Sequence, residues 1–137
     1  MAALFRMSEA TALGLHAAVL VAEAEGPVSA AHMAGTLDAS EAHLAKVLQS
    51  LTRAGLLRSK RGPRGGYVLA RAASEISLLD VYESLEGKLP SVTCLFERTQ
   101  CDRPQCILGG LIEFVRTQIG DYLSCTSLQD AASMHGS

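Results

Sequence analysis

The sequence contains no tryptophan, and aromatic residues make up only 4% of it, so its core must be built from aliphatic side chains and alanine. Such a composition suits helices better than strands. No apolar run reaches the about 18 residues that a transmembrane helix needs. The first residues lack the charged leader and apolar stretch of a signal peptide. We therefore expect a cytoplasmic protein without a membrane partner, in which structural disulfides between the four cysteines are not expected.

Charge is distributed unevenly along the 137 residues, although the net charge is only -2. Residues 1–71 hold eight basic and five acidic residues, whereas residues 72–137 hold four basic and nine acidic ones. The stretch 46–71 has no acidic residue, and its cations are Lys46, Arg53, Arg58, Lys60, Arg61, Arg64 and Arg71. A basic block on a mildly acidic chain indicates a polyanion-binding face, although a solvated surface can have the same composition.

Three helices are predicted before residue 55. The first, residues 8–24, is apolar over much of its girth and is stopped by Glu25-Gly26-Pro27. Ser29 caps a short second helix that ends near Leu37. The D-x-x-E signal at 38–41 predicts the start of the third helix. Its inner face is predicted at i, i+3, i+4 and i+7, by Leu44, Val47, Leu48 and Leu51.

A β-hairpin and two further helices are predicted after residue 55. Residues 56–60 and 67–70 form two short strands around the basic Gly/Pro turn 61–66. A capping box at 77–80 opens a fourth helix, which ends at Gly87. A last helix runs from about residue 107 to 123, and the tail 130–137 is expected to fray. The predicted fold is mainly α, a winged helix–turn–helix followed by a long C-terminal helix.

This arrangement predicts a DNA-binding protein. A helix of the second and third helix pair fits the major groove, and cations on the hairpin neutralise phosphates beside it. The predicted DNA contacts are Ser40, Ala42, His43, Lys46, Arg58, Lys60, Arg61 and Arg64. Winged helices that bind only proteins are the alternative. An enzyme is not expected, because no nucleophile–base motif and no Gly-rich phosphate loop before a helix is present.

Three of the four cysteines lie within 13 residues, with the spacing Cys94-x6-Cys101-x4-Cys106. Three thiolates just before a helix can converge on one site, and thiolates suit iron–sulfur clusters or zinc. The spacing lacks the paired C-x-x-C of a zinc ribbon, which disfavours zinc. Free thiols and a thiol–disulfide switch remain alternatives. Cys125, about 28 Å from Cys106 along the last helix, is expected to be a packed thiol.

The segment 54–71, with R-G-P-R-G-G-Y at 61–67, resembles the wing of the IscR/NsrR family of bacterial regulators. Residues 75–81 and 6–8 are also similar to that family. The resemblance implies a homodimer joined by the last helix, and binding to palindromic operators in double-stranded DNA. It further implies that the cysteine loop carries a cluster in many members and none in others. Cluster-binding members share three cysteines there, and the outer pair of this chain has their usual separation.

The resemblance also bears on a fourth cluster ligand. Some members use a histidine one turn after the third cysteine, but that position is Gly109 in this chain. Others recruit a carboxylate or histidine from the first helix of the partner subunit. The carboxylate position corresponds to Ala12, whose side chain cannot bind a metal. The histidine position corresponds to His16, and Glu9 is a weaker candidate. His16 can equally be an ordinary core or surface histidine.

The sequence as a whole predicts a DNA-binding domain at 1–87, a cysteine cluster loop at 88–106, and a dimerisation helix with tail at 107–137. The predicted function is a homodimeric transcription regulator. Its operator affinity is expected to depend on a 2Fe–2S or 4Fe–4S cluster held by Cys94, Cys101, Cys106 and His16. A cluster-free regulator of the same fold, switched by thiol–disulfide chemistry, is the alternative.

Overall fold

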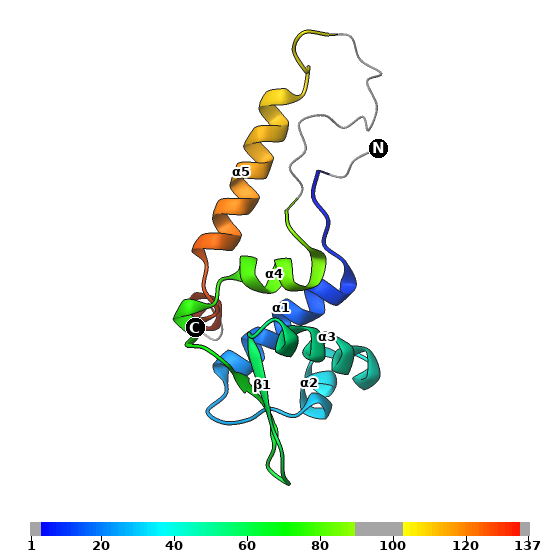
Figure 1. Ribbon diagram of the computed structural model, residues 1–137, viewed down its shortest axis with the longest axis vertical. Coiled ribbons are helices and arrows are strands. Elements are labelled where there is room, and N and C mark those ends of the chain that lie inside the picture. Colours follow the sequence, from blue (N-terminus) through cyan, green and yellow to red (C-terminus); the bar gives the residue numbers. More distant parts are fainter. Residues whose placement is uncertain (1–3, 90–102, 135–137) are drawn as a thin grey trace.

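The computed structural model describes residues 4–89 and 103–134. Its elements in chain order are α1 (Glu9–Glu23), α2 (Ala30–Leu37), α3 (Glu41–Arg53), β1 (Leu57–Lys60), β2 (Gly66–Leu69), the 3-10 turn η1 (Ala73–Glu75), α4 (Leu78–Glu86), α5 (Gly109–Cys125) and α6 (Leu128–Ser133). Figure 1 shows that α1 to α4 together form one body, from which the hairpin projects downward and α5 extends upward. None of the described helices is long and apolar enough to cross a membrane.

The core is aliphatic, as the composition predicts. The four residues predicted for the inner face of α3 are all at most 3% exposed, and α2 adds the fully buried Met33. Tyr82 of α4 is also completely buried and adds an aromatic ring to this core. Because α1 packs against α2, α3, α4 and α6, it forms the centre of this body.

Serine side chains set the start of five helices. Ser8, Ser29, Ser40, Ser77 and Ser127 each accept a hydrogen bond from the backbone N–H three residues later. Such caps satisfy donors that have no partner within the helix. The signal at 38–41 predicted the start of α3 correctly, since α3 begins at Glu41, but the capping side chain is that of Ser40 and not of Asp38. Asp38 instead ends α2 in the left-handed conformation, with φ of 51°, which a short polar side chain tolerates.

The hairpin is held to the body by an added backbone pair. β1 and β2 are antiparallel, and Val28 in the α1–α2 connection exchanges two backbone hydrogen bonds with Tyr67 of β2. Gly66 has a φ of 157°, and a Cβ there would lie 2.5 Å from the carbonyl carbon of Val28. A glycine is therefore needed where the hairpin meets this connection.

The C-terminal segment packs back against the body formed by α1 to α4. The sequence instead predicted that the tail from residue 130 frays. Ser127 and Asp130 form a capping box that opens α6. Leu128 is 1% exposed, and α6 packs against α1 and η1. The N–H of Leu78 donates to the carbonyl of Thr126, and the N–H of Leu128 donates to the carbonyl of Ile76, both at 2.8 Å. The start of α4 and the end of α5 are thus tied together.

Candidate nucleic-acid interface and cysteine segment

The outer face of α3 carries the residues predicted to read DNA. Ala42 and Lys46 are exposed, and His43 is half-buried. Ser40 is exposed, but its hydroxyl accepts the N–H of His43 at 3.3 Å and so also serves as the helix cap. The opposite face of α3 is buried in the core, so α3 has the orientation that the helical period predicted.

This outer stripe continues beyond the predicted residues. Gln49 and Arg53 follow Ala42 at i+7 and i+11, and both are exposed. The helical period of 3.6 residues could have identified them, since it places them on the same face as Lys46. The sequence reasoning counted Arg53 only as part of the basic block.

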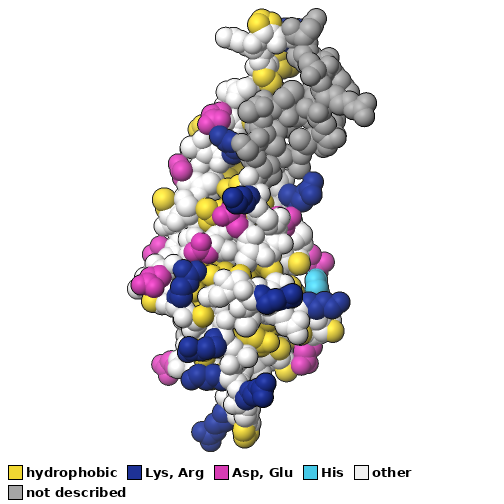
Figure 2. Space-filling view, in the orientation of Figure 1, with side chains coloured by type: hydrophobic (Ala, Val, Ile, Leu, Met, Phe, Trp, Pro, Cys, Tyr) yellow, Lys and Arg dark blue, Asp and Glu magenta, His cyan; other side chains and the backbone are white. Residues whose placement is uncertain are grey.

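The hairpin presents the predicted wing cations to solvent. Leu57 at the start of β1 is 2% exposed and anchors the strand to the core, whereas the next three residues of β1 are exposed. All four predicted wing residues are exposed: Arg58, Lys60, Arg61 and Arg64. Figure 2 shows Lys and Arg side chains spread over the lower half of this face down to the hairpin. The acid-free block therefore folds into a projecting basic element.

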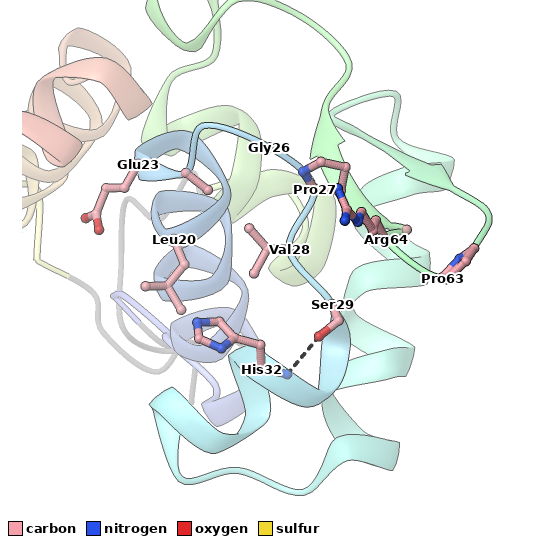
Figure 3. Close-up of a pocket in the computed structure, with 11 residues that line it drawn as sticks. Leu20, Glu23, Gly26, Pro27, Val28, Ser29, His32, Pro63 and Arg64 are labelled. Atoms are coloured by element: carbon pink, nitrogen blue, oxygen red, sulfur yellow. Dashed lines mark hydrogen bonds between the residues drawn. The ribbon is translucent and has the colours of Figure 1, made fainter.

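Arg64 lines a hollow between the hairpin and the beginning of α2. Figure 3 shows Pro63 at the bend of the hairpin, whereas the Arg64 side chain lies beside Pro27 of the α1–α2 connection. Ser29 and His32 of α2 line the same hollow, and the Ser29 hydroxyl accepts the N–H of His32 at 3.1 Å. Arg64 is thus placed next to the α2 N-terminus, while the hairpin bend lies farther out.

The cysteine site is described only at its last member, since Cys94 and Cys101 lie outside the described residues. Cys106 is an exposed free thiol three residues before α5. Its sulfur accepts the N–H of Leu108 at 3.4 Å. Cys125 is exposed at the end of α5, so the prediction that it is a packed thiol was wrong.

His16 lies on α1 with an exposed ring. Its Nδ1 is 2.7 Å from the carbonyl oxygen of Ala12, one turn earlier. In the neutral imidazole this contact places the proton on Nδ1 and leaves the Nε2 lone pair open. Figure 1 shows that α5 begins at the opposite end of the molecule from the body that contains α1. The predicted ligand role of His16 therefore requires the partner subunit and stays a prediction.

The N-terminal segment is fastened to α4, which leads into the cysteine segment. The Tyr82 hydroxyl donates to the Arg6 carbonyl at 2.5 Å, and the Phe5 ring stacks on Tyr82 with 5.7 Å between centroids. Burial, together with the nearby Glu86 carboxylate, raises the pKa of Tyr82. Hydrogen bonds from Thr11 and Ser8 lower the pKa of Glu86.

One side of α5 exposes large apolar residues instead of burying them in the chain. Ile112 and Leu123 are buried, but the helix exposes Leu111 (56%), Phe114 (62%) and Tyr122 (57%). Ile107 (78%) and Leu108, just before the helix, are exposed as well. Such a surface on one helix is typical of a protein-contact region.

The chain was compared with known proteins. A family model, Rrf2, described as an iron-dependent transcriptional regulator, matches residues 7–133. The chain is 43% identical over 82 residues to BadM of Rhodopseudomonas palustris, a putative HTH-type transcriptional regulator. That match covers 59% of this chain but only 53% of the relative's length. The chain is also 34% identical over 109 residues to the HTH-type transcriptional regulator CymR of Bacillus subtilis, covering 80% and 75% of the two chains.

Solved structures give the same result. The structure of CymR, described as the global cysteine regulator of B. subtilis, has a TM-score of 0.81 at 31% identity and covers 96% of this chain and 98% of its own. That of T. potens IscR has a TM-score of 0.75 at 28% identity, with coverages of 96% and 88%. These likenesses confirm the winged-helix fold, and the relatives are regulators and not enzymes. The chain belongs to the Rrf2 family of transcriptional regulators.

Proposed function

We propose that this regulator binds duplex DNA as a homodimer, with α3 in the major groove and the hairpin against the neighbouring backbone at the adjacent minor groove. The observation that carries this proposal is the folding of the acid-free block 46–71, which combines the exposed side of α3 with a projecting basic hairpin. Positive charge on two adjacent elements suits phosphates on both sides of a groove.

The homodimer is supported by α5. In the described residues α5 packs mainly against α4, which leaves Leu111 and Phe114 exposed. A two-fold contact between two copies of this helix buries the same surface on both chains. It also fixes the separation of the two α3 helices, which must be about 34–36 Å to read successive major grooves.

The cofactor part of the proposal is an iron–sulfur cluster held by Cys94, Cys101 and Cys106. Cys106 fits such a role, because its sulfur is exposed, is not in a disulfide and accepts a backbone N–H. When bound, the cluster supplies a redox centre that can react with small oxidants. The residues of this chain hold it beside the start of α5, and His16 of the partner subunit offers an open Nε2. Ligation then fixes the loop relative to α5 and thereby the spacing of the two reading helices.

A thiol-switched regulator without a cluster is the second candidate. It is favoured by the exposure of Cys106, because an accessible thiol can form a disulfide with another cysteine. In that case oxidation, without iron, changes the arrangement of α5. The DNA-binding part of the proposal is the same for both candidates.

Two measurements test the proposal separately. Duplex DNA binding is measured by fluorescence anisotropy at several salt concentrations, and a linear fall of log affinity with log salt is expected. Absence of salt-dependent binding would contradict the DNA-binding function. Visible absorption and Mössbauer spectra of anaerobically purified protein test the cluster. Colourless, iron-free protein whose DNA affinity changes with thiol oxidation would favour the thiol switch instead.

A further inference from the structure

A polar cleft lies between the C-terminal half of α3 and the hairpin, outside the set of predicted DNA contacts. It has a volume of about 340 Å³ and is lined by Gln49, Thr52, Arg53, Ser59 and Tyr67. Ser59 of β1 and Tyr67 of β2 are directly paired across the hairpin. Paired residues project from the same face of a two-stranded sheet, so this face is turned toward the last turns of α3.

Most polar groups of the cleft have no partner within the described chain. The Thr52 hydroxyl donates to the Leu48 carbonyl at 2.7 Å. In the described ranges no side-chain hydrogen bond or ion pair engages Gln49, Arg53, Ser59 or Tyr67. The cleft therefore offers one guanidinium, an amide and two hydroxyls, and no carboxylate lines it. Such a set fits an anion with several acceptor oxygens, and a phosphodiester is an anion of this kind.

The position of the cleft fits that ligand. In the proposed function, α3 occupies the major groove and the wing reaches the adjacent minor groove. One strand of phosphates separates these two grooves, and it must pass between the two protein elements that occupy them. The cleft is the space between α3 and the hairpin.

We propose that this cleft binds a phosphodiester of the strand between the two grooves. Arg53 supplies the charge, and the Tyr67 hydroxyl and Gln49 amide donate hydrogen bonds to phosphate oxygens. This inference rests on the proposed DNA-binding function and adds a contact set that the sequence pattern did not identify. Arg53 also lies in the last turn of α3, where any cation favours the helix dipole. The test must therefore separate stability from DNA binding.

The experiment uses two cleft variants and a matched control on the full chain. Arg53→Gln removes the charge, and Tyr67→Phe removes only a hydroxyl without a partner while keeping the ring. Arg6→Gln is the control, because it removes an exposed arginine from the segment before α1. Affinity for a mixed-sequence 30-base-pair duplex (a length of about three helical turns) is measured over a range of salt, and thermal unfolding reports stability.

The expected results differ for each variant. Arg53→Gln should lower the salt slope by about 1.8 for the homodimer, because each of its two subunits loses one phosphate contact worth about 0.9. Tyr67→Phe should weaken binding of the homodimer by about a hundredfold, about tenfold for each of the two lost hydroxyls, at every salt concentration and with an unchanged slope, because the hydroxyl bonds a charged oxygen. Arg6→Gln should keep the wild-type slope, and Tyr67→Phe should keep the wild-type melting temperature.

A chemical variant of the DNA locates the contact. On a duplex selected from a random pool by the wild-type protein, single phosphates are replaced by neutral methylphosphonates. One replacement between the grooves should weaken wild-type binding and have no further effect on Arg53→Gln. Wild-type affinity and slope in both cleft variants would overturn the inference and leave the DNA-binding function standing. A wild-type protein without salt-dependent binding would remove both.

Discussion

Glu86 and Thr11 lie 75 residues apart in the sequence, and a hydrogen bond from the Thr11 hydroxyl to the Glu86 carboxylate joins the end of α4 to the first turn of α1. The same carboxylate oxygen accepts the backbone N–H of Ser8 at 3.1 Å. Thr11 is completely buried, so its hydroxyl depends on protein partners. The helix that precedes the cysteine segment is thereby fixed to the helix at the centre of the DNA-binding body.

Removing this carboxylate should destabilise the protein. We expect Glu86→Ala to lower the free energy of unfolding by about 1.5–3 kcal/mol, the range for hydrogen bonds to a charged group. Urea denaturation at neutral pH measures the change. Glu83→Ala, on the same helix, is the control, since no hydrogen bond of its side chain is found in the described residues. Equal losses in both variants would show that the Glu86 contacts contribute nothing specific.

The same contact predicts a pH dependence. Hydrogen bonds from Thr11 and Ser8 lower the pKa of Glu86 below its ordinary value of 4.5 in the folded state. The stability that this carboxylate contributes is therefore present above pH 4.5 and is lost as the pH falls through the lowered value. The difference in unfolding free energy between wild type and Glu86→Gln should shrink between pH 6 and pH 3. A difference that stays constant over this range would contradict the role of the charge.

The close approach of the hairpin to the α1–α2 connection predicts a strong effect at one glycine. In Gly66→Ala the new Cβ would overlap the backbone of Val28 and strain a φ of 157°. The expected cost is about 1–3 kcal/mol of unfolding free energy, with weaker DNA binding because the wing shifts. Gly26→Ala is the matched control, because a Cβ there meets nothing within 4 Å. Similar stability and affinity in the two variants would show that the hairpin needs no glycine at 66.

The exposed surface of α5 predicts a dimer that one charge can disrupt. Phe114→Glu should give monomers, because a carboxylate would be buried at the two-fold contact without a partner. Thr117→Glu is the control and should leave assembly unchanged, because this exposed position on the same helix already carries a polar side chain. Size-exclusion chromatography with light scattering measures the mass. A dimeric Phe114→Glu protein would place the interface elsewhere.

His16 gives a prediction that separates the cluster from its fourth ligand. We expect His16→Ala to shift or bleach the visible spectrum of anaerobic protein, while Cys94→Ala, Cys101→Ala or Cys106→Ala abolishes it. His32→Ala removes an exposed histidine of α2 and should leave the spectrum intact. An unshifted, full-strength spectrum in His16→Ala would exclude this histidine as a ligand without affecting the cysteine proposal.

The sequence predicted elements whose pattern is local, and missed those that depend on distant contacts. The spacing of Leu44, Val47, Leu48 and Leu51 identified the buried side of α3 correctly, because helical period alone decides it. Helix α6 has six residues, too few to be stable alone, and it exists because Leu128 packs into the core. Its capping box at 127–130 repeats the pattern of 77–80, and this was the signal available in the sequence.

Within the candidate site, the same limit applies to the hairpin and the cysteines. The basic residues of the wing could be named from composition, but the cleft beside Arg53 arises from the pairing of Ser59 with Tyr67 and the angle of α3. The exposure of Cys125 could not be predicted either, because it depends on how the chain turns at Thr126 to bring α6 back to α1.

The two backbone hydrogen bonds that join Ile76 and Leu78 to Leu128 and Thr126 make the foot of α5 a fulcrum. A helix of 17 residues is about 25 Å long at a rise of 1.5 Å per residue. A displacement of about 2 Å at its free end, next to Cys106, then corresponds to a swing of only about 5° about that fulcrum. This end of α5 is anchored to α6 and through it to α1. Under the proposed function, a small chemical change at Cys106 would therefore turn the body that carries α3.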